Sequence, residues 1–322
     1  MSTFKIYNLK NIVFFGYLNY YSELIKFNKN LGLNTQVFVP KGIKVNSNIN
    51  FKFFKKIDKN ITPYLDSLDK KNTLFISLGC GYIFKNNEIK KYFNNKIVNF
   101  HNTRLPFNKG RAYVSWQILN QDRIFNSAIH LVNEKIDDGA IIYENASVIP
   151  SNLSTPKQIQ KFDDDQTIEL YKKFILKLKS KKEFKILRNS KNIGSYNYPL
   201  NTDMHGFINW NLPALDLKNF ITAFDEPYKG ASSFLNSNIK ERLYIKKVQL
   251  HAGEFYNNSF TSGTVIRNNK NWLVVACSGN FSIIIEEVLN KKGVNILSSI
   301  KQGYRFVTPE KFILKTYERV KY

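Results

Sequence analysis

Several kinds of residue are scarce in this sequence, and each scarcity excludes a class of protein. Only two of the 322 residues are cysteines, Cys80 and Cys277, which lie far apart and outside any Cys-x-x-Cys pair. This excludes a disulfide framework, and free thiols suit a reducing cytoplasm. The four histidines show no metal-ligand spacing with these cysteines, so we expect no metal site.

Long apolar segments are also missing. No apolar run reaches the roughly 18 residues that a membrane-spanning helix needs. No apolar stretch of the kind found in signal peptides follows Met1–Phe4. We therefore expect a cytoplasmic protein without a membrane span.

Two common catalytic and cofactor motifs are absent as well. No Gly-x-Gly-x-x-Gly follows the first predicted strand, so no dinucleotide cofactor is indicated. Between Ile97 and Ile142, no Ser or Cys lies in the tight strand-to-helix turn that presents a catalytic nucleophile. A covalent acyl-enzyme is therefore not indicated.

Acidic residues are the minority among the charged ones, with 25 Asp and Glu against 48 Lys and Arg. The net charge of +23 would normally indicate a nucleic-acid or anionic partner. The lysines are, however, spread along the chain, and the abundance of Lys and Asn is typical of an AT-rich genome. We interpret most lysines as solvated, with some contribution to binding a phosphorylated substrate, and expect no nucleic-acid partner.

The first half of the sequence has the pattern of a doubly wound α/β domain. Apolar strands are predicted at Asn11–Gly16, Thr35–Pro40, Thr73–Leu78 and Ile97–Phe100, with helical spacing at Tyr20–Leu31 between the first two. A strand, a glycine, a helix and another strand are the usual start of a mostly parallel, Rossmann-like sheet. The ligands of such sheets lie beyond the carboxyl ends of the strands.

The second half changes in character. Ala128–Val132 and Ala140–Val148 predict an antiparallel addition to the sheet, and Asp163–Lys179 predicts an amphipathic helix that covers it. Thr155-Pro156 can cap a helix, and Ser190–Met204 has the composition of a linker. A small β-barrel is then predicted from four short β runs at Leu243–Leu250, Gly263–Ile266, Trp272–Ala276 and Phe281–Val288. We therefore predict two domains, 1–203 and 204–322.

Three polar residues suit acyl transfer to an amine. Asn99 and His101 lie two apart on a predicted strand, so their side chains project from one face. An amide donates a fixed hydrogen bond to a developing oxyanion, and an imidazole exchanges protons near neutral pH. Asp137, in the turn Asp137-Asp138-Gly139, supplies a carboxylate that can orient the imidazole or accept a proton.

The order and spacing of these residues resemble the signature of the folate-dependent formyltransferases. That family has Asn-x-His, then Leu-Pro, then Arg-Gly, a helix, a strand with a histidine, and Asp-x-Gly. Asn99, His101 and Asp137 fall on its catalytic Asn, His and Asp. Four residues depart from the pattern beside these three: Asn102 replaces a Pro, Thr103 a Ser, Arg104 a Leu, and Lys109 the Arg before Gly110. His130 also matches a histidine of the family, but we interpret it as a half-buried structural imidazole.

The resemblance implies N10-formyltetrahydrofolate as co-substrate and no metal. It places the folate contacts on the loop Gly81, Tyr82 and Ile83 and on Gly139. Contacts to the acceptor substrate are expected from Thr103, Lys109, Arg111 and Trp116. The residues Ile208–Trp210 and Tyr228–Ala231 resemble the start of the family's C-terminal domain, so the predicted barrel is expected to be OB-like.

The alternative functions differ mainly in the molecule that accepts the formyl group. Gly110-Arg111-Ala112 followed by Trp116, together with Tyr228–Ala231, resembles the branch that formylates nucleotide-linked amino sugars for lipopolysaccharide or O-antigen assembly. The net charge favours methionyl-tRNA formyltransferase, and glycinamide ribonucleotide formyltransferase comes third because its enzymes lack this tail. A nucleic-acid-binding OB-type protein with an inactive formyltransferase domain is the alternative from another class. The oligomeric state is left open, with a homodimer among the options.

Overall fold

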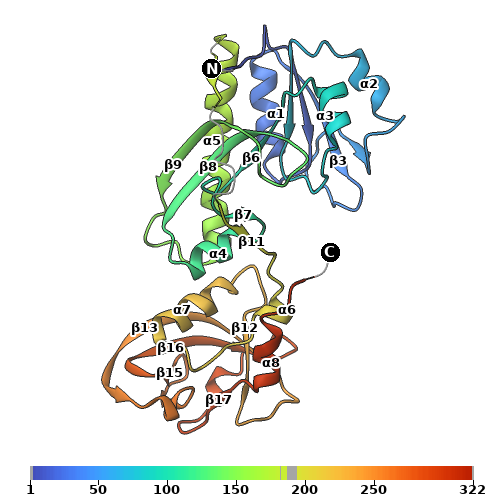
Figure 1. Cartoon of the computed structure of the whole chain (residues 1–322). Coiled ribbons are helices and arrows are strands. Elements are labelled where there is room, and N and C mark those ends of the chain that lie inside the picture. Colours follow the sequence, from blue (N-terminus) through green and yellow to red (C-terminus); the bar gives the residue numbers. More distant parts are fainter. Residues whose placement is uncertain (1–2, 182, 187–193, 321–322) are drawn as a thin grey trace. The chain divides into compact units, whose positions relative to one another are not determined.

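The computed structural model describes residues 3–181, 183–186 and 194–320 (Figure 1). They form two compact units. The first unit contains residues 1–110, 124–148 and 162–196, and the second contains 111–123, 149–161 and 197–322. The division into domains at 203/204 stays a prediction. Three segments that precede this boundary in the chain, 111–123, 149–161 and 197–203, belong to the second unit.

The first unit is built on a seven-stranded sheet with the order β4-β3-β2-β5-β6-β8-β9. Its strands are β2 (Asn11–Phe15), β3 (Asn34–Pro40), β4 (Lys52–Phe54), β5 (Thr73–Ser77), β6 (Ile97–His101), β8 (Ile124–Leu131) and β9 (Ile141–Val148). The strands from β4 to β6 pair in parallel, whereas β8 and β9 are added antiparallel. The predicted α/β class, the mostly parallel sheet and the antiparallel addition are all confirmed.

Helices cover both faces of this sheet (Figure 1). On one face, α1 (Tyr21–Asn30) and the later turns of α5 (Pro156–Lys179) bury a core that includes Phe14, Tyr21 and Tyr171. On the other face, α2 (Thr62–Ser67) and α3 (Asn86–Phe93) cover a smaller core. A strand such as β2 is apolar at successive positions because both its faces are buried.

Helix α5 begins at Pro156, seven residues before the predicted start at Asp163. The Thr155 hydroxyl accepts a hydrogen bond from Gln158 N, and the Gln158 side chain accepts one from Thr155 N. This reciprocal capping box, with proline at the first helical position, fixes the start of the helix. Across the described part of the chain, no helix is both long and apolar enough to cross a membrane.

The predicted linker Ser190–Met204 contains the change from the first unit to the second between Tyr196 and Asn197, and its described residues form two short elements. Residues 190–193 lie outside the described residues. Strand β11 (Tyr196–Asn197) pairs with β7 (Lys109–Gly110), and helix α6 (Thr202–His205) is capped by the Asn201 side chain. Two further short strands, β1 (Thr3–Phe4) and β10 (Phe184–Lys185), pair with each other.

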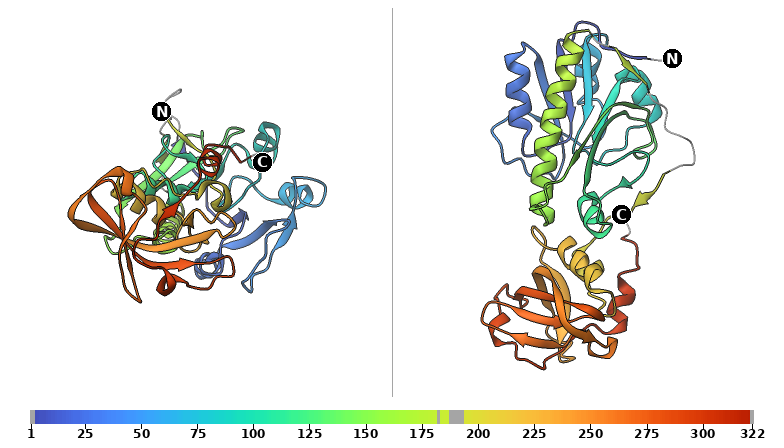
Figure 2. Two further views of the ribbon diagram at one scale, coloured as in Figure 1. Left: turned by 90° about the horizontal axis from the view of Figure 1, so that it is seen from below. Right: turned by 90° about the vertical axis from the view of Figure 1, so that its left-hand side faces the viewer.

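The second unit contains an antiparallel sheet with the order β14-β15-β16-β13-β12-β17. Its strands are β12 (Ala231–Leu235), β13 (Leu243–Asn257), β14 (Val265–Asn268), β15 (Leu273–Ala276), β16 (Gly279–Leu289) and β17 (Phe306–Val307). Hydrogen bonds between residues 263–265 and 303–306 join the two ends of the sheet, which therefore curls into a barrel-like form, as Figure 2 shows. The predicted OB-like β domain is thereby confirmed.

Helices and short 3-10 turns complete the second unit. They are α4 (Tyr113–Leu119), α7 (Ala214–Ala223), α8 (Glu310–Lys315), η1 (Ser259–Thr261) and η2 (Leu297–Ser299). Helix α4 is held against α7, because the Ser115 hydroxyl donates to the carbonyl of Ala223 over 2.8 Å. This contact explains why residues 111–123 group with the second unit.

Candidate active site

The carboxyl end of β6 brings the predicted catalytic residues together. Asn99 and His101 lie on one face of the strand, as their spacing predicts, and both are partly buried. The antiparallel register with β8 places His130 opposite Asn99. A single strand pair therefore gathers one amide and two imidazoles at one end of the sheet.

His130 contacts the amide of Asn99 directly. His130 Nδ1 lies 2.9 Å from the carbonyl of Leu131, which can only accept, so this nitrogen carries the proton. Nε2 then has a free lone pair and accepts from Asn99 Nδ2 over 3.1 Å. The interpretation of His130 as a structural imidazole missed this contact. With this tautomer of His130, the NH2 group of the Asn99 amide, not its oxygen, faces the ring. The second Nδ2 hydrogen of Asn99 then remains for another acceptor.

The pKa of the partly buried His101 imidazole is shifted so that the neutral ring is favoured. Burial lowers its pKa below the ordinary value, while the charge of Asp137 and a hydrogen bond with the backbone of Asn108 act in the opposite direction. Its Nδ1 lies 3.6 Å from Asp137 Oδ1. Its Nε2 is buried and has no hydrogen-bond partner among the described residues. An orphaned nitrogen of this kind is suited to a proton or a substrate atom.

Asp137 is held in place by its backbone. Its φ of 51° lies in the left-handed region, which few residues other than glycine adopt without a local reason. Its Oδ2 accepts from Gly110 N over 3.1 Å, and its Oδ1 lies 3.8 Å from His130 Nε2. The neighbouring Asp138 instead forms an ion pair with Lys109 over 2.5 Å and is more exposed.

Gly139 has a packing reason to be glycine. A Cβ placed on it would lie 1.5 Å from the carbonyl oxygen of Leu131, so any side chain would displace the β8 backbone. Leu131 N also donates to the carbonyl of Ala140 over 2.9 Å. The close approach of this turn to β8 carries Asp137 toward His101. The predicted folate contact of Gly139 stays a prediction.

The other predicted folate residues lie in the loop between β5 and α3. Tyr82 is anchored, because its hydroxyl donates to Glu88 Oε1 over 2.8 Å. Ile83 is 55% exposed, whereas the neighbouring Phe84 is buried. Gly81 is exposed as well. The loop thus offers backbone and apolar surface at the carboxyl end of the sheet, and its contact with folate stays a prediction.

The predicted substrate residues are divided between the two units. In the first, Thr103 is buried and its hydroxyl donates to the carbonyl of Asn108 over 3.0 Å, whereas Lys109 pairs with Asp138. Arg111 and Trp116 belong to the second unit, where Trp116 Nε1 donates to the carbonyl of Tyr198 over 2.9 Å. Their contacts with a substrate stay predictions.

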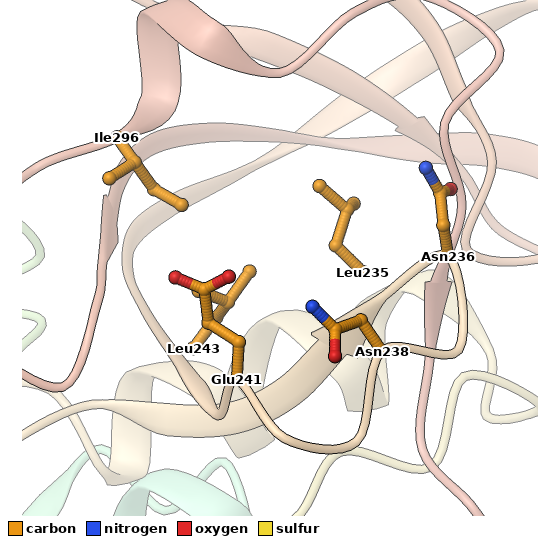
Figure 3. A pocket seen from close by; sticks show the side chains of 6 residues that line it. All are labelled: Leu235, Asn236, Asn238, Glu241, Leu243 and Ile296. Carbon is orange, nitrogen blue, oxygen red and sulfur yellow. The ribbon is translucent and has the colours of Figure 1, made fainter.

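A hollow of about 210 Å³ lies on the β-barrel of the second unit. Figure 3 shows Leu235, Leu243 and Ile296 on its walls, with the polar side chains of Asn236, Asn238 and Glu241 beside them. It contains none of the predicted site residues. It also lacks any buried polar side chain directed into it, so it identifies no ligand.

The two imidazoles predict a loss of stability in acid. Burial, followed by the proximity of His101, lowers the pKa of His130 to about 4. The unfolded chain, with a histidine pKa near 6.5, binds this proton earlier, so stability is complete above about pH 6.5 and falls as the pH drops toward 4. The expected loss from His130 is on the order of 3 kcal/mol.

Hydrogen exchange of the β8 amides measures this loss. In His130→Gln, the opening free energy of β8 is expected to depend less on pH between 6.5 and 4 than in the wild type. The matched control is His251→Gln on β13, which is expected to follow the wild type. Equal slopes for the wild type and His130→Gln would contradict the prediction.

The family follows from comparison of the sequence with known proteins. Residues 41–173 match the formyl transferase family, and residues 202–304 match the C-terminal domain of the formyl transferases. The chain belongs to the folate-dependent formyltransferase family of enzymes. This confirms the resemblance seen in the order of Asn99, His101 and Asp137.

Individual relatives are distant. The methionyl-tRNA formyltransferase of Finegoldia magna is 27% identical over 252 residues, which cover 74% of each chain. The bifunctional polymyxin resistance protein ArnA of Wigglesworthia glossinidia brevipalpis is 25% identical over 211 residues, or 63% of this chain and 30% of ArnA. The fold is shared with the N-formyltransferase from Helicobacter canadensis in complex with folinic acid and dTDP-3-aminofucose. That similarity has a TM-score of 0.65 and 18% identity and covers 86% of this chain and 99% of the other.

Proposed function

We propose that this enzyme transfers a formyl group from N10-formyltetrahydrofolate to the primary amine of a nucleotide-linked amino sugar. The observation that carries the formyl transfer is the cluster of Asn99, His101 and Asp137 at the carboxyl end of the sheet, with one orphaned imidazole nitrogen. An amide donor, an imidazole and a carboxylate are groups that suit acyl transfer to an amine.

Each residue of the cluster has one role in the proposed reaction. The folate donor supplies the formyl group, whose oxygen gains negative charge as the amine nitrogen bonds to the formyl carbon. Asn99 donates the second hydrogen of Nδ2 to that oxygen, since the first is used by His130. Asp137, whose Oδ1 lies 3.6 Å from His101 Nδ1, takes up the proton that the amine loses, directly or through water. His101 relays that proton through Nε2 to folate N10 as the bond between the formyl carbon and N10 breaks, so that tetrahydrofolate leaves and the formamide remains on the sugar.

The chemistry of the acceptor is supported by sequence and by fold. The turn Gly110-Arg111-Ala112 with Trp116 resembles the amino-sugar branch. The Helicobacter canadensis enzyme, solved in complex with dTDP-3-aminofucose, aligns with this chain over 99% of its own length. In the first unit, Lys109 is a cation beside the cluster, and a diphosphate requires only one or two such cations. The pairing of Lys109 with Asp138 holds this cation in position.

Methionyl-tRNA is a second candidate acceptor, and the sequence relatives favour it. The Finegoldia magna relative is a methionyl-tRNA formyltransferase, and the charge of +23 would suit tRNA. A tRNA body needs a continuous basic surface, and its binding falls steeply with salt. No block of five consecutive Lys or Arg occurs in this sequence, so we favour the sugar.

A direct comparison of acceptors tests this proposal. The purified chain receives N10-formyltetrahydrofolate together with either methionyl-tRNA or a panel of dTDP-, UDP- and GDP-linked amino sugars. We expect mass spectrometry to find a formyl group on at least one sugar and none on the tRNA. Formylation of the tRNA alone would replace the proposed acceptor. Salt-sensitive RNA binding without binding of 5-formyltetrahydrofolate would instead favour a nucleic-acid-binding protein.

A further inference from the structure

Asn102, directly after His101, joins three elements of the first unit through one oxygen atom. Its Oδ1 lies 3.0 Å from the hydroxyl of Ser127 on β8 and 3.0 Å from the hydroxyl of Thr167 on α5. Ser127 and Thr167 are each 1% exposed. The end of β6 is therefore tied to a neighbouring strand and to the helix that covers the sheet.

This junction lies where the backbone ladder ends. The last pair of β6 and β8 is His101 with Ala128, so Asn102 and Ser127 are next in the register. A hydrogen bond between the side chains of Ser127 and Asn102 therefore links the two strands one residue beyond their last backbone pair. The single hydrogen of the Thr167 hydroxyl has two acceptors, Asn102 Oδ1 and the carbonyl of Asp163, which lies 2.8 Å away, so it is divided between them, and Ser127 is the stronger donor to Asn102.

The position of the His101 ring depends on the backbone around it. Its Nε2 has no partner within the described residues, and the 3.6 Å between Nδ1 and Asp137 exceeds a normal hydrogen bond, so the hydrogen bond that the ring does form is with the backbone of Asn108. Where the family pattern has proline after the catalytic histidine, the ring of that proline fixes φ covalently. This chain has Asn102 there, whose φ is not fixed by a ring, and its side chain is bonded on two sides instead.

We propose that Asn102 is a positioning residue that holds the backbone beyond β6, and with it the His101 imidazole, through Ser127 and Thr167. The inference rests on the proposed role of His101 in formyl transfer. A displacement of a catalytic group by about 1 Å can cost roughly 10²-fold in rate. Removal of Asn102 Oδ1 as a hydrogen-bond acceptor is expected to displace His101 by less than this, because β6 remains paired with β5 and β8.

Steady-state kinetics separates positioning from a structural role. We expect Asn102→Ala to lower kcat about tenfold while the KM values of both substrates stay within about twofold. Asn102→Asp keeps an oxygen for both hydroxyls and is expected to retain most of kcat. Adding Ser127→Ala to Asn102→Ala is expected to cause no further loss. The matched control is Asn126→Ala on β8, whose amide donates only to the carbonyl of Ile124 in the described contacts.

An unchanged kcat in Asn102→Ala, with a lower melting temperature, would overturn the proposal. If Asn102→Ala does not fold, the double variant Ser127→Ala/Thr167→Val removes both hydroxyl partners and takes its place with the same expectation. A second readout does not depend on turnover: the ¹⁵N-labelled His101 ring signals are expected to broaden or double in the variant, while those of His251 stay unchanged. A single sharp His101 signal would also overturn it. Absence of formyl transfer in the wild type would refute the proposed function and leave this readout valid.

Discussion

Replacement of His101 by alanine is expected to lower kcat for formyl transfer by roughly 10²–10⁴-fold, the usual contribution of a positioned acid or base. Burial of the ring lowers its pKa and so favours the neutral form, and Nε2 has no hydrogen-bond partner in the described residues. Asn99→Ala should lower kcat by roughly 10²–10³-fold, because it removes the donor to the formyl oxygen.

Both variants are measured in the same assay with N10-formyltetrahydrofolate and the amino sugar that the acceptor panel shows to be a substrate. His251→Ala is the control for His101→Ala, since His251 lies on β13 of the second unit. Circular dichroism must show that each variant is folded. Turnover at the wild-type rate by folded His101→Ala would show that the assignment of the acid-base group is wrong.

The second large effect distinguishes two adjacent carboxylates. Asp137→Asn is expected to lower kcat by roughly 10²-fold or more, whereas Asp138→Asn should change it only a few-fold. Asp137 lies 3.6 Å from the His101 ring and is fixed by Gly110 N, while Asp138 pairs with Lys109 nearer the solvent. The two substitutions are chemically identical, so each is the control for the other.

The pH profile adds a second measurement. Asp137 raises the pKa of His101, which burial lowers, so Asp137→Asn should lower that pKa further. The acid limb of kcat/KM, where activity falls as His101 becomes protonated, is therefore expected to move to lower pH in Asp137→Asn. A larger loss of kcat in Asp138→Asn than in Asp137→Asn would show that the register of the Asp-x-Gly motif is wrong.

The parts of the fold that sequence predicts well are those with strong local patterns. The strands β2, β3, β5 and β6 are confirmed within one or two residues, because each contains a short run of buried apolar residues, which is typical of strands covered on both faces. The amphipathic spacing predicts the start of α5 only at Asp163, and the helix cap predicted at Thr155-Pro156 is where the helix in fact begins. The true start was signalled by the capping box of Thr155 and Gln158, a short motif that spacing alone does not reveal.

The sequence predicts the site only in part, because it does not reveal the register in which β8 pairs with β6. Spacing along β6 places Asn99 and His101 on one face, but the proximity of Asp137 to His101 came from the family resemblance. The contact of His130 with Asn99 depends on how β8 pairs with β6, and alternating strands accept several registers until tertiary packing selects one. The same holds for Asn102 and Ser127, which are distant in sequence and meet only through this pairing.

Transfer of an isotopically labelled formyl group tests the central claim most directly. The wild-type chain is mixed with N10-[¹³C]formyltetrahydrofolate and a dTDP-linked amino sugar, and the products are followed by NMR. The account predicts that the label moves to the amine of the sugar as a formamide, and that this transfer is lost in His101→Ala. Label that stays on the folate, or appears as free formate whether or not the sugar is present, would contradict it.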